Sequence, residues 1–404
     1  MGVRESAIYL RMEADFLPLG EDAFLFNPNE PISHLEISPV SFKSNPLLAL
    51  AAATVLATSS MGASNEVHPE ATTVDLSFRI MRNWDVHLPA EVFSPIGTSI
   101  PFAAAGEAGL KVAIEEGALR IDRDGDGEFD GRVQTPDEEK GSQLVVFRLN
   151  AGAENETSYA VRVANKGRWS FAPAGAMEGQ IGGTRFLVFD QNGNGKFNDY
   201  GVDAMIVGRG KTASFLSSSI HVDGVLNEFS ISADGKTASL APYSGPTGKL
   251  DMGSDLDTKA KMRSVVVNSK DGKHSYELSR ALGTDTGWGI IPGRMSVPAG
   301  DYIMHSAQVV LGKSHADMKT GRSKPISVKA GATATVTWGG PVNAEFAYAR
   351  SGGEVNIGPN DIMYYGSAGE QYSNFMPLGS SPRFAIKEKS TGDVLVNAVF
   401  PGNC

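Results

Sequence analysis

Carboxylates gather in one short stretch of the sequence, "LRIDRDGDGEFDGRV", at residues 119–133. Asp122, Asp124, Asp126 and Asp130 fall within nine residues, and a glycine follows the second and the third of them. Like charges packed this densely repel one another, so a positive group is expected to hold them together. Calcium takes about 6 to 8 oxygen ligands, and alternate residues of a tight loop can turn their carboxylates towards one centre. The stretch therefore predicts a calcium-binding loop.

The pattern Asp-x-Asp-x-Asp-Gly-x-x-Asp also assigns roles to the residues between the carboxylates. Gly127 permits the sharp bend, and Glu128 stands at the position whose backbone carbonyl serves as a ligand. The loop resembles the first half of an EF-hand loop and the nine-residue calcium loops of integrin-type FG-GAP repeats. Val133 stands where an EF-hand has glutamate, and the flanks look like strands, which favours a hairpin. The FG-GAP flanking signature is missing, so the likeness does not extend to a β-propeller.

A second stretch, "LVFDQNGNGKFNDYGVD" at residues 187–203, repeats this register. Its ligand positions, in order, are Asp190, Asn192, Asn194, Lys196 through its backbone carbonyl and Asn198, with Asp199 as a further candidate. Amides replace carboxylates at three positions, and fewer anionic ligands mean weaker calcium binding. Asp199 and Asp203 could restore charge from outside the loop. We expect two calcium sites, the first the stronger; a metal-free turn in which Asp and Asn bond their own backbone is the alternative for both.

Short alternating runs and Asp-Gly turns fill the chain after residue 64. In "ATATVTW", at residues 332–338, small or apolar residues alternate with threonines, as a half-buried strand requires. Three stretches read as β-hairpins around tight turns: "ISADGKTASLA", "VVVNSKDGKHSYEL" and "FAIKEKSTGDVLVNAVF". Glycine is abundant at 46 of 404 residues, which fits many tight turns. The predicted fold class is mostly β, with several small β-sandwich-like domains and two calcium-loop hairpins.

Proline, glycine and charge clusters suggest where these domains begin and end. The expected units are a β-rich domain with the first loop at 64–150, one with the second loop at 151–250, and β-sandwiches at 256–338 and 339–404. "SVPAGDYIMHS" and "ISVKAGATATVTW" make the third unit similar to bacterial immunoglobulin-like or carboxypeptidase-regulatory-like sandwiches. The single cysteine, Cys404, excludes an intrachain disulfide.

The apolar run at 46–63, "PLLALAAATVLATSSMGA", follows Lys43 and ends in small residues, as a secretory signal peptide does. It turns polar at Thr58, too early for a membrane span of about 20 apolar residues. We expect an exported periplasmic or extracellular protein that begins near Ser64, without a membrane span. Residues 1–45 are an N-terminal extension, either a long presequence or the result of a start assigned upstream of Val40.

The net charge of −10 argues against a nucleic-acid partner. Nucleophile-elbow, zinc-protease, P-loop and dinucleotide-binding motifs are absent from the sequence. We therefore expect a binding or scaffolding role towards an extracellular carbohydrate or protein, and lean against an enzyme. The alternative is an exported hydrolase, acting on polysaccharide, which needs paired acidic residues in a cleft of residues 64–246. The whole chain resembles uncharacterised secreted proteins of environmental bacteria, a resemblance that implies export and names no activity.

Overall fold

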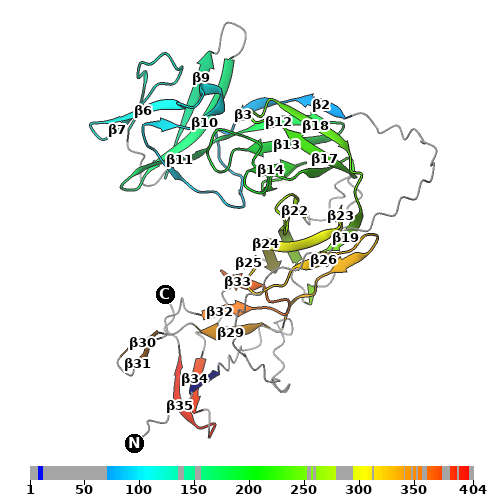
Figure 1. Ribbon diagram of the computed structural model, residues 1–404. Helices are drawn as coiled ribbons and strands as arrows, with labels where there is room; N and C mark the ends of the chain where they lie inside the picture. Colours follow the sequence, from blue (N-terminus) through cyan, green and yellow to red (C-terminus); the bar gives the residue numbers. More distant parts are fainter. Residues whose placement is uncertain are drawn as a thin grey trace, which may run out of the picture.

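The computed structural model describes residues 8–11, 71–134, 141–150, 156–252, 256–257, 261–278, 294–311, 314–340, 342–346, 349–351, 354–356, 362–374, 383–388 and 391–399. These residues form strands β1 to β35 and one short 3-10 helix, η1 (Ala103–Ala105) (Figure 1). The predicted mostly β fold class is confirmed. The expected signal peptide, the extension apart from β1 (Ile8–Arg11), and the expected mature start lie outside the described residues. In the part of the chain that is described, no helix is long and apolar enough to cross a membrane.

Four antiparallel sheets occupy the region from Thr72 to Pro242. Two of them contain, in spatial order, β4 (Ser94–Pro95), β11 (Trp169–Pro173), β10 (Glu156–Asn165) and β9 (Gln143–Asn150), and β5 (Ser99–Ile100), β6 (Leu110–Glu115), β7 (Ala118–Ile121) and β8 (Gly131–Val133). The other two contain β15 (Ser214–Phe215), β14 (Ala204–Val207), β13 (Thr184–Phe189), β12 (Gly175–Ile181) and β3 (Ser77–Ile80), and β16 (Ser219–Val222), β17 (Val225–Ile231), β18 (Thr237–Pro242) and β2 (Thr72–Asp75).

One hydrophobic core joins these four sheets. Phe147, Tyr159 and Phe186 are among its fully buried side chains, and they come from β9, β10 and β13. Strands β9 and β10 lie on either side of the domain boundary expected near Asn150, and they pair with each other, with Asn150 opposite Glu156. Residues on both sides of that position therefore share one core, and both predicted loops are attached to it.

The remaining strands form further sheets, and a second hydrophobic core packs among those from β19 to β33. The largest sheet contains, in order, β22 (Ser275–Glu277), β21 (Lys261–Ser269), β24 (Gly300–Leu311), β25 (Ser314–Lys319), β33 (Gln371–Ser373), β32 (Ile362–Tyr365) and β29 (Asn343–Phe346), with β26 (Ile326–Val328) paired to β24. Smaller sheets combine β23 (Arg294–Pro298), β19 (Thr247–Asp251) and β27 (Thr333–Thr335); β20 (Leu256–Asp257) and β28 (Trp338–Gly339); β30 (Ala349–Ser351) and β31 (Glu354–Asn356); and β1, β34 (Arg383–Glu388) and β35 (Val394–Val399).

The three predicted Asp-Gly or Gly-Asp hairpins are present as β17–β18, β21–β22 and β34–β35. The strand expected at 332–338 is interrupted. Its β27 pairs in parallel with β19, and its β28 pairs in parallel with β20. The expected alternation is nevertheless kept, because the threonines are exposed while Trp338 is fully buried.

Candidate metal centre

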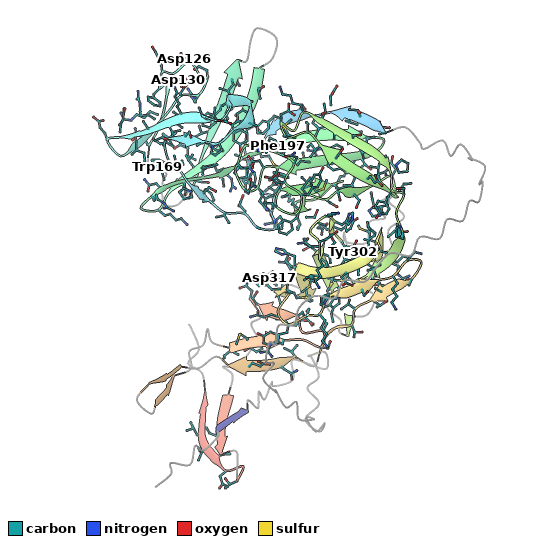
Figure 2. All side chains as sticks on the ribbon, in the orientation of Figure 1. Asp126, Asp130, Trp169, Phe197, Tyr302 and Asp317 are labelled. Atoms are coloured by element: carbon teal, nitrogen blue, oxygen red, sulfur yellow. The ribbon has the colours of Figure 1, made fainter. Side chains whose placement is uncertain are left out.

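The first predicted loop connects β7 and β8, which pair antiparallel with Leu119 opposite Val133 and Ile121 opposite Gly131. The loop is therefore the turn of a β-hairpin, as its strand-like flanks predicted. Leu119, Ile121 and Val133 are buried in the core. Figure 2 shows Asp126 and Asp130 at the outer end of this sheet, whereas Phe197 of the second loop lies among the sheets of the core. The two loops thus lie in different surroundings.

Asp122 organises the backbone of the first loop. Its carboxylate is buried, and its two oxygens accept hydrogen bonds from the backbone nitrogens of Gly125 at 2.7 Å and Gly127 at 3.0 Å. Both glycines have positive φ, 80° and 95°, a region that residues with a Cβ rarely adopt. The two tight turns that wrap the loop around Asp122 therefore explain the glycines after the second and third aspartates.

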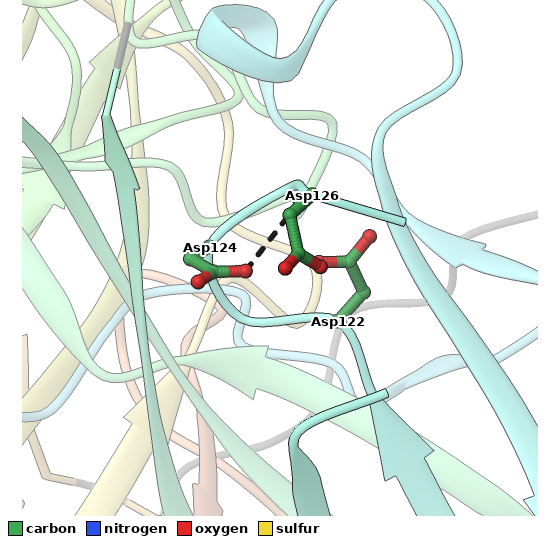
Figure 3. Close-up of side chains that lie close together, drawn as sticks. All are labelled: Asp122, Asp124 and Asp126. Carbon is green, nitrogen blue, oxygen red and sulfur yellow. Dashed lines mark hydrogen bonds between the residues drawn. The ribbon is translucent and has the colours of Figure 1, made fainter. Parts of the chain in front are cut away.

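Three carboxylates converge inside this loop (Figure 3). Asp122, Asp124 and Asp126 each offer an oxygen, and these oxygens lie within 4.8 Å of one another. Asp124 also accepts a long backbone hydrogen bond from Asp126, at 3.4 Å, and Asp126 accepts one from Glu128, at 2.8 Å. The buried member stands at the base of the loop and the two exposed members stand at its rim. This cluster could hold a metal ion.

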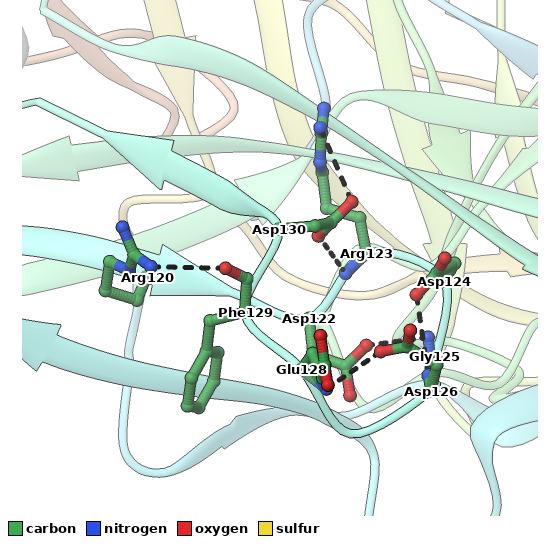
Figure 4. Close-up of polar contacts among 9 residues, drawn as sticks. All are labelled: Arg120, Asp122, Arg123, Asp124, Gly125, Asp126, Glu128, Phe129 and Asp130. Carbon is green, nitrogen blue, oxygen red and sulfur yellow. Dashed lines mark hydrogen bonds and ion pairs between the residues drawn. The ribbon is translucent and has the colours of Figure 1, made fainter.

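Asp130 and Glu128 lie outside the three-carboxylate cluster (Figure 4). Asp130 accepts a hydrogen bond from the backbone nitrogen of Arg123 at 3.1 Å, and its other oxygen lies 3.6 Å from the Arg123 guanidinium. The ninth-position carboxylate thus closes the base of the hairpin. The side chain of Glu128 is exposed, so in keeping with the sequence pattern its backbone carbonyl is the group assigned to a metal.

A lysine reaches the same loop from β6. A Cβ placed on Gly127 would lie 3.7 Å from Nζ of Lys111. The backbone of β6 also touches the base of the loop, because the carbonyl of Lys111 accepts a hydrogen bond from the nitrogen of Asp122 at 3.1 Å. The Lys111 ammonium group therefore lies beside the turn at Gly127. No local sequence pattern indicates this contact, because Lys111 lies on a separate strand.

The second loop repeats three hydrogen bonds of the first, whereas Oδ1 of Asp190 accepts from one residue further along than Oδ1 of Asp122 does. Asp190 takes the place of Asp122, accepting hydrogen bonds from the nitrogens of Asn194 at 3.1 Å and Gly195 at 2.8 Å. Asn192 accepts one from the Asn194 nitrogen, and Asn194 accepts one from the Lys196 nitrogen at 2.9 Å. Strands β13 and β14 flank this loop and pair antiparallel. The internal repeat seen in the sequence is therefore also a repeat of backbone structure.

Side-chain amides fill the second loop where the first has a cluster of carboxylates. Nδ2 of Asn192 donates to Oδ2 of Asp199 at 2.9 Å, and Nδ2 of Asn194 donates to the same oxygen. Asp203 accepts hydrogen bonds from the backbone nitrogens of Gln191 at 3.1 Å and Asp199 at 3.0 Å. The carboxylates of Asp199 and Asp203 already have donors within the protein. Asn198, at the ninth position, is half-buried.

Burial changes the acidity of the second loop. Asp190 and Asp203 are both fully buried. Burial raises the pKa of Asp190 to about 6, against the lowering effect of hydrogen bonds from Tyr159 and from backbone nitrogens. Burial, and then the negative charge of Asp190, raise the pKa of Asp203 to about 8. These values apply to the loop without a cation.

Tyr159 is a partner that the sequence reasoning missed. Its hydroxyl donates to Oδ2 of Asp190 at 2.7 Å, and its ring stacks on Phe102 with centroids 4.5 Å apart. It lies on β10, 31 residues before Asp190 in the chain. A long-range contact of this kind leaves no local motif. The phenol anchors the second loop in the core.

A serine and a histidine also lie together outside the loops. Oγ of Ser219 is 2.8 Å from Nδ1 of His274 and also contacts the hydroxyl of Tyr276. Ser219 of β16 thus contacts residues at the start of β22, near the hydrogen bond from the Phe215 nitrogen to Oγ of Ser275. Ser219 is fully buried, so a substrate cannot reach its hydroxyl. The contact joins the two cores and does not form a catalytic site.

No protein-family model, no curated protein and no solved structure matches this chain. The candidate metal centre is therefore inferred from the geometry of the loop alone.

Proposed function

We propose that this chain is an exported calcium-binding multidomain β protein with a binding or scaffolding role. The observation that supports the proposal most strongly is the convergence of Asp122, Asp124 and Asp126 in a hairpin turn. Dissociation constants of about 10⁻⁴ to 10⁻³ M suffice for extracellular modules, because calcium is plentiful outside cells. An exposed site of this kind suits an exported protein.

The donor set of the first loop favours calcium over other metals. Its donors are carboxylate oxygens, with the backbone carbonyl of Glu128 nearby in sequence and two carboxylates open to water. Zinc prefers nitrogen and sulfur ligands, and magnesium requires near-octahedral geometry at shorter distances. Calcium accepts irregular sets of oxygen ligands completed by water. The loop therefore offers what calcium requires.

We assign a second, weaker calcium site to the loop of Asp190, Asn192, Asn194, Lys196 and Asn198, with Asp199 at its side. Its backbone shares three hydrogen bonds with the first loop. A cation there competes with the amide groups that now donate to Asp199, and it meets fewer carboxylates. Both effects lower its affinity relative to the first site.

Calcium-dependent unfolding of the purified protein tests the proposal. A ligand that binds only the folded state at ~100-fold excess over its dissociation constant stabilises it by about 2.7 kcal/mol. The double change Asp122→Ala with Asp126→Ala should remove most of the calcium-induced rise in melting temperature, and Asp190→Ala should remove less. Equal stabilisation by magnesium at matched ionic strength would instead indicate screening of a repulsive acidic turn and would overturn the assignment.

Two hollows of the described residues lack the paired carboxylates that the hydrolase alternative needs. Two hollows of about 280 and 290 Å³ occur in the described residues, and between them they are lined by a single carboxylate, Asp234. A polysaccharide hydrolase generally needs two carboxyl groups facing one another across a cleft. Binding or scaffolding is therefore the function that we propose.

A further inference from the structure

Strand β22 and the turn before it join two units of the chain (Figure 1). The first unit is the four sheets that contain β2 to β18, and the second unit is the sheets around the second core, from β19 to β33. Across this junction, the nitrogen of Phe215 donates to Oγ of Ser275 at 3.0 Å, and the nitrogen of Ser275 donates to Oγ of Ser217 at 3.1 Å. The nitrogen of Ser218 donates to the carbonyl of Lys273 at 2.8 Å. Domains joined by polar contacts of this kind can move relative to one another.

Two histidines support the junction in either charge state. Nδ1 of His274 lies 2.8 Å from Oγ of Ser219, and Nε2 of His305 lies 3.0 Å from the carbonyl oxygen of Pro89. A protonated imidazole can still donate to a hydroxyl or a carbonyl oxygen. Burial lowers the pKa of His274, and the nearby Asp271 carboxylate opposes that effect. Protonation of these two rings therefore leaves their contacts in place.

A third histidine, His221, lies between the two units. Ile220 and Val222, its neighbours on β16, pack into the first core, so the side chain of His221 points the other way. Its ring lies edge-on to Tyr276 of the second unit, with centroids 6.0 Å apart. Its hydrogen-bond partner is the backbone of Ser296 on β23, also in the second unit. His221 is only 6% exposed, so the second unit shields it from water.

The contacts of His221 do not suit a positive charge. From β17 it meets Leu226, which also packs against the second core, and from β23 it meets a backbone group. Tyr276, the titratable group that faces it from β22, is uncharged in acid. None of these contacts supplies a carboxylate to balance an imidazolium. A buried charge without a partner is costly, and water reaches the ring when the two units separate.

We propose that the junction is an acid-sensitive switch, in which protonation of His221 separates the first unit from the second while both cores stay folded. The side chain of His221 belongs to neither core, and the junction depends on a small number of polar contacts. The chain is therefore closed at neutral pH and extended in acid. This inference goes beyond the proposed function and does not depend on calcium.

The size of the effect follows from proton linkage. Burial lowers the pKa of His221 to about 4 in the closed arrangement, whereas a hydrated ring in the open one has the ordinary value of 6.5. The closed arrangement is thus favoured above the ordinary pKa and loses ground as pH falls towards the lowered one. Between about pH 7 and about pH 5, the ratio of open to closed molecules should rise about 20-fold.

Hydrogen exchange of the backbone amides of the full chain tests this switch. Exchange is measured at about pH 7 and about pH 5 and corrected for the intrinsic effect of pH. We expect the junction amides of Phe215, Ser218 and Ser275 to lose about 20-fold in protection, while the amides of β13 and β24, within the two cores, keep theirs. The radius of gyration from small-angle X-ray scattering should rise over the same change of pH.

Variants at His221 distinguish the switch from general acid unfolding. His221→Phe keeps a ring but cannot be protonated, so its junction amides should stay protected in acid; His221→Gln is a second variant with the same expectation. His315→Gln removes an exposed histidine outside the junction and should behave like the unaltered protein. The proposal is overturned if the junction amides lose protection as much in the His221 variants. Equal loss of protection by the core amides of the unaltered protein would also overturn it.

Discussion

The change Asp124→Asn should affect the protein in opposite directions with and without calcium. Asp124 is exposed, and its one described hydrogen bond, from the nitrogen of Asp126, is 3.4 Å long. Asparagine keeps the accepting oxygen and the size of the side chain but removes the charge. The folded loop without calcium therefore loses repulsion and little else, whereas the proposed calcium site would lose one of its three converging carboxylates.

The magnitude follows from the separation of the oxygens. Unit charges at 4.8 Å, the upper limit of the separation of these oxygens, repel by about 0.9 kcal/mol in bulk water, and physiological salt screens roughly half of that. Neutralising Asp124 removes two of the three repulsive pairs, so the free energy of unfolding in chelator should rise by about 1 kcal/mol. In calcium at ~100-fold excess over the wild-type dissociation constant, the variant should lose most of the roughly 2.7 kcal/mol that binding supplies.

Urea denaturation measures both effects. Wild type and variant are unfolded in excess chelator and in excess calcium, and Glu107→Gln, which removes an exposed charge outside the loop, serves as the matched control. We expect the control to keep the full calcium effect. The reasoning is refuted if Asp124→Asn lowers stability in chelator and leaves the calcium-induced gain intact, because the carboxylate would then act through local structure and not through its charge.

Three further predictions concern other parts of the chain. Burial lowers the pKa of His221 to about 4, whereas the unfolded chain has the ordinary value of about 6.5. As pH drops through this range the unfolded chain binds a proton and the folded chain does not, so the free energy of unfolding should fall by up to about 3 kcal/mol. His221→Phe should flatten this slope in denaturation curves measured across that range. Gly195→Ala should lower the free energy of unfolding by about 3 kcal/mol, because the φ of Gly195 is +82° and a Cβ would lie 2.4 Å from Cα of Phe102. Gly210 has open space around it, so Gly210→Ala should be nearly neutral. Equal losses of stability in the two variants would contradict this account. N-terminal sequencing of the exported protein should find a start near Ser64, and an intact Met1 would disprove export by cleavage.

Local patterns predicted much of the fold and part of the site. Alternation and Asp-Gly turns indicated the hairpins β17–β18 and β21–β22, since strand and turn preferences act over a few residues. The Asp-x-Asp-x-Asp-Gly spacing likewise predicted the convergence of Asp122, Asp124 and Asp126, because one bend brings alternate residues together. Each of these predictions needed only neighbours in sequence.

The sequence could not predict which hydrogen-bond and ion-pair partners the loop residues would find in the folded protein. Asp130 fits the ninth ligand position, yet it pairs with Arg123, whose backbone and side chain both reach it. Asp190 receives its hydrogen bond from Tyr159 on a distant strand, and Lys111 reaches the first loop from β6. The parallel pairing that interrupts residues 332–338 has the same origin, since β27 and β28 pair with different strands. Contacts between distant segments depend on how the chain packs, so the spacing of residues in the sequence does not predict them.

The two loops share a backbone arrangement, but their surroundings give them different roles. Asp190 is fully buried, and Gly195 lies against the backbone of Phe102, so the second loop is held by the core and by its own amides. The first loop projects from the sheet with two carboxylates in water, and a cation can reach it directly. It is still coupled to global stability, because Leu119, Ile121 and Val133 of its flanking strands are buried in the shared core. Calcium bound to the first loop should therefore raise the unfolding midpoint of all four sheets that share this core. If calcium instead slows hydrogen exchange of the backbone amides of β7 and β8 and yet leaves the unfolding midpoint unchanged, the loop is not coupled to global stability.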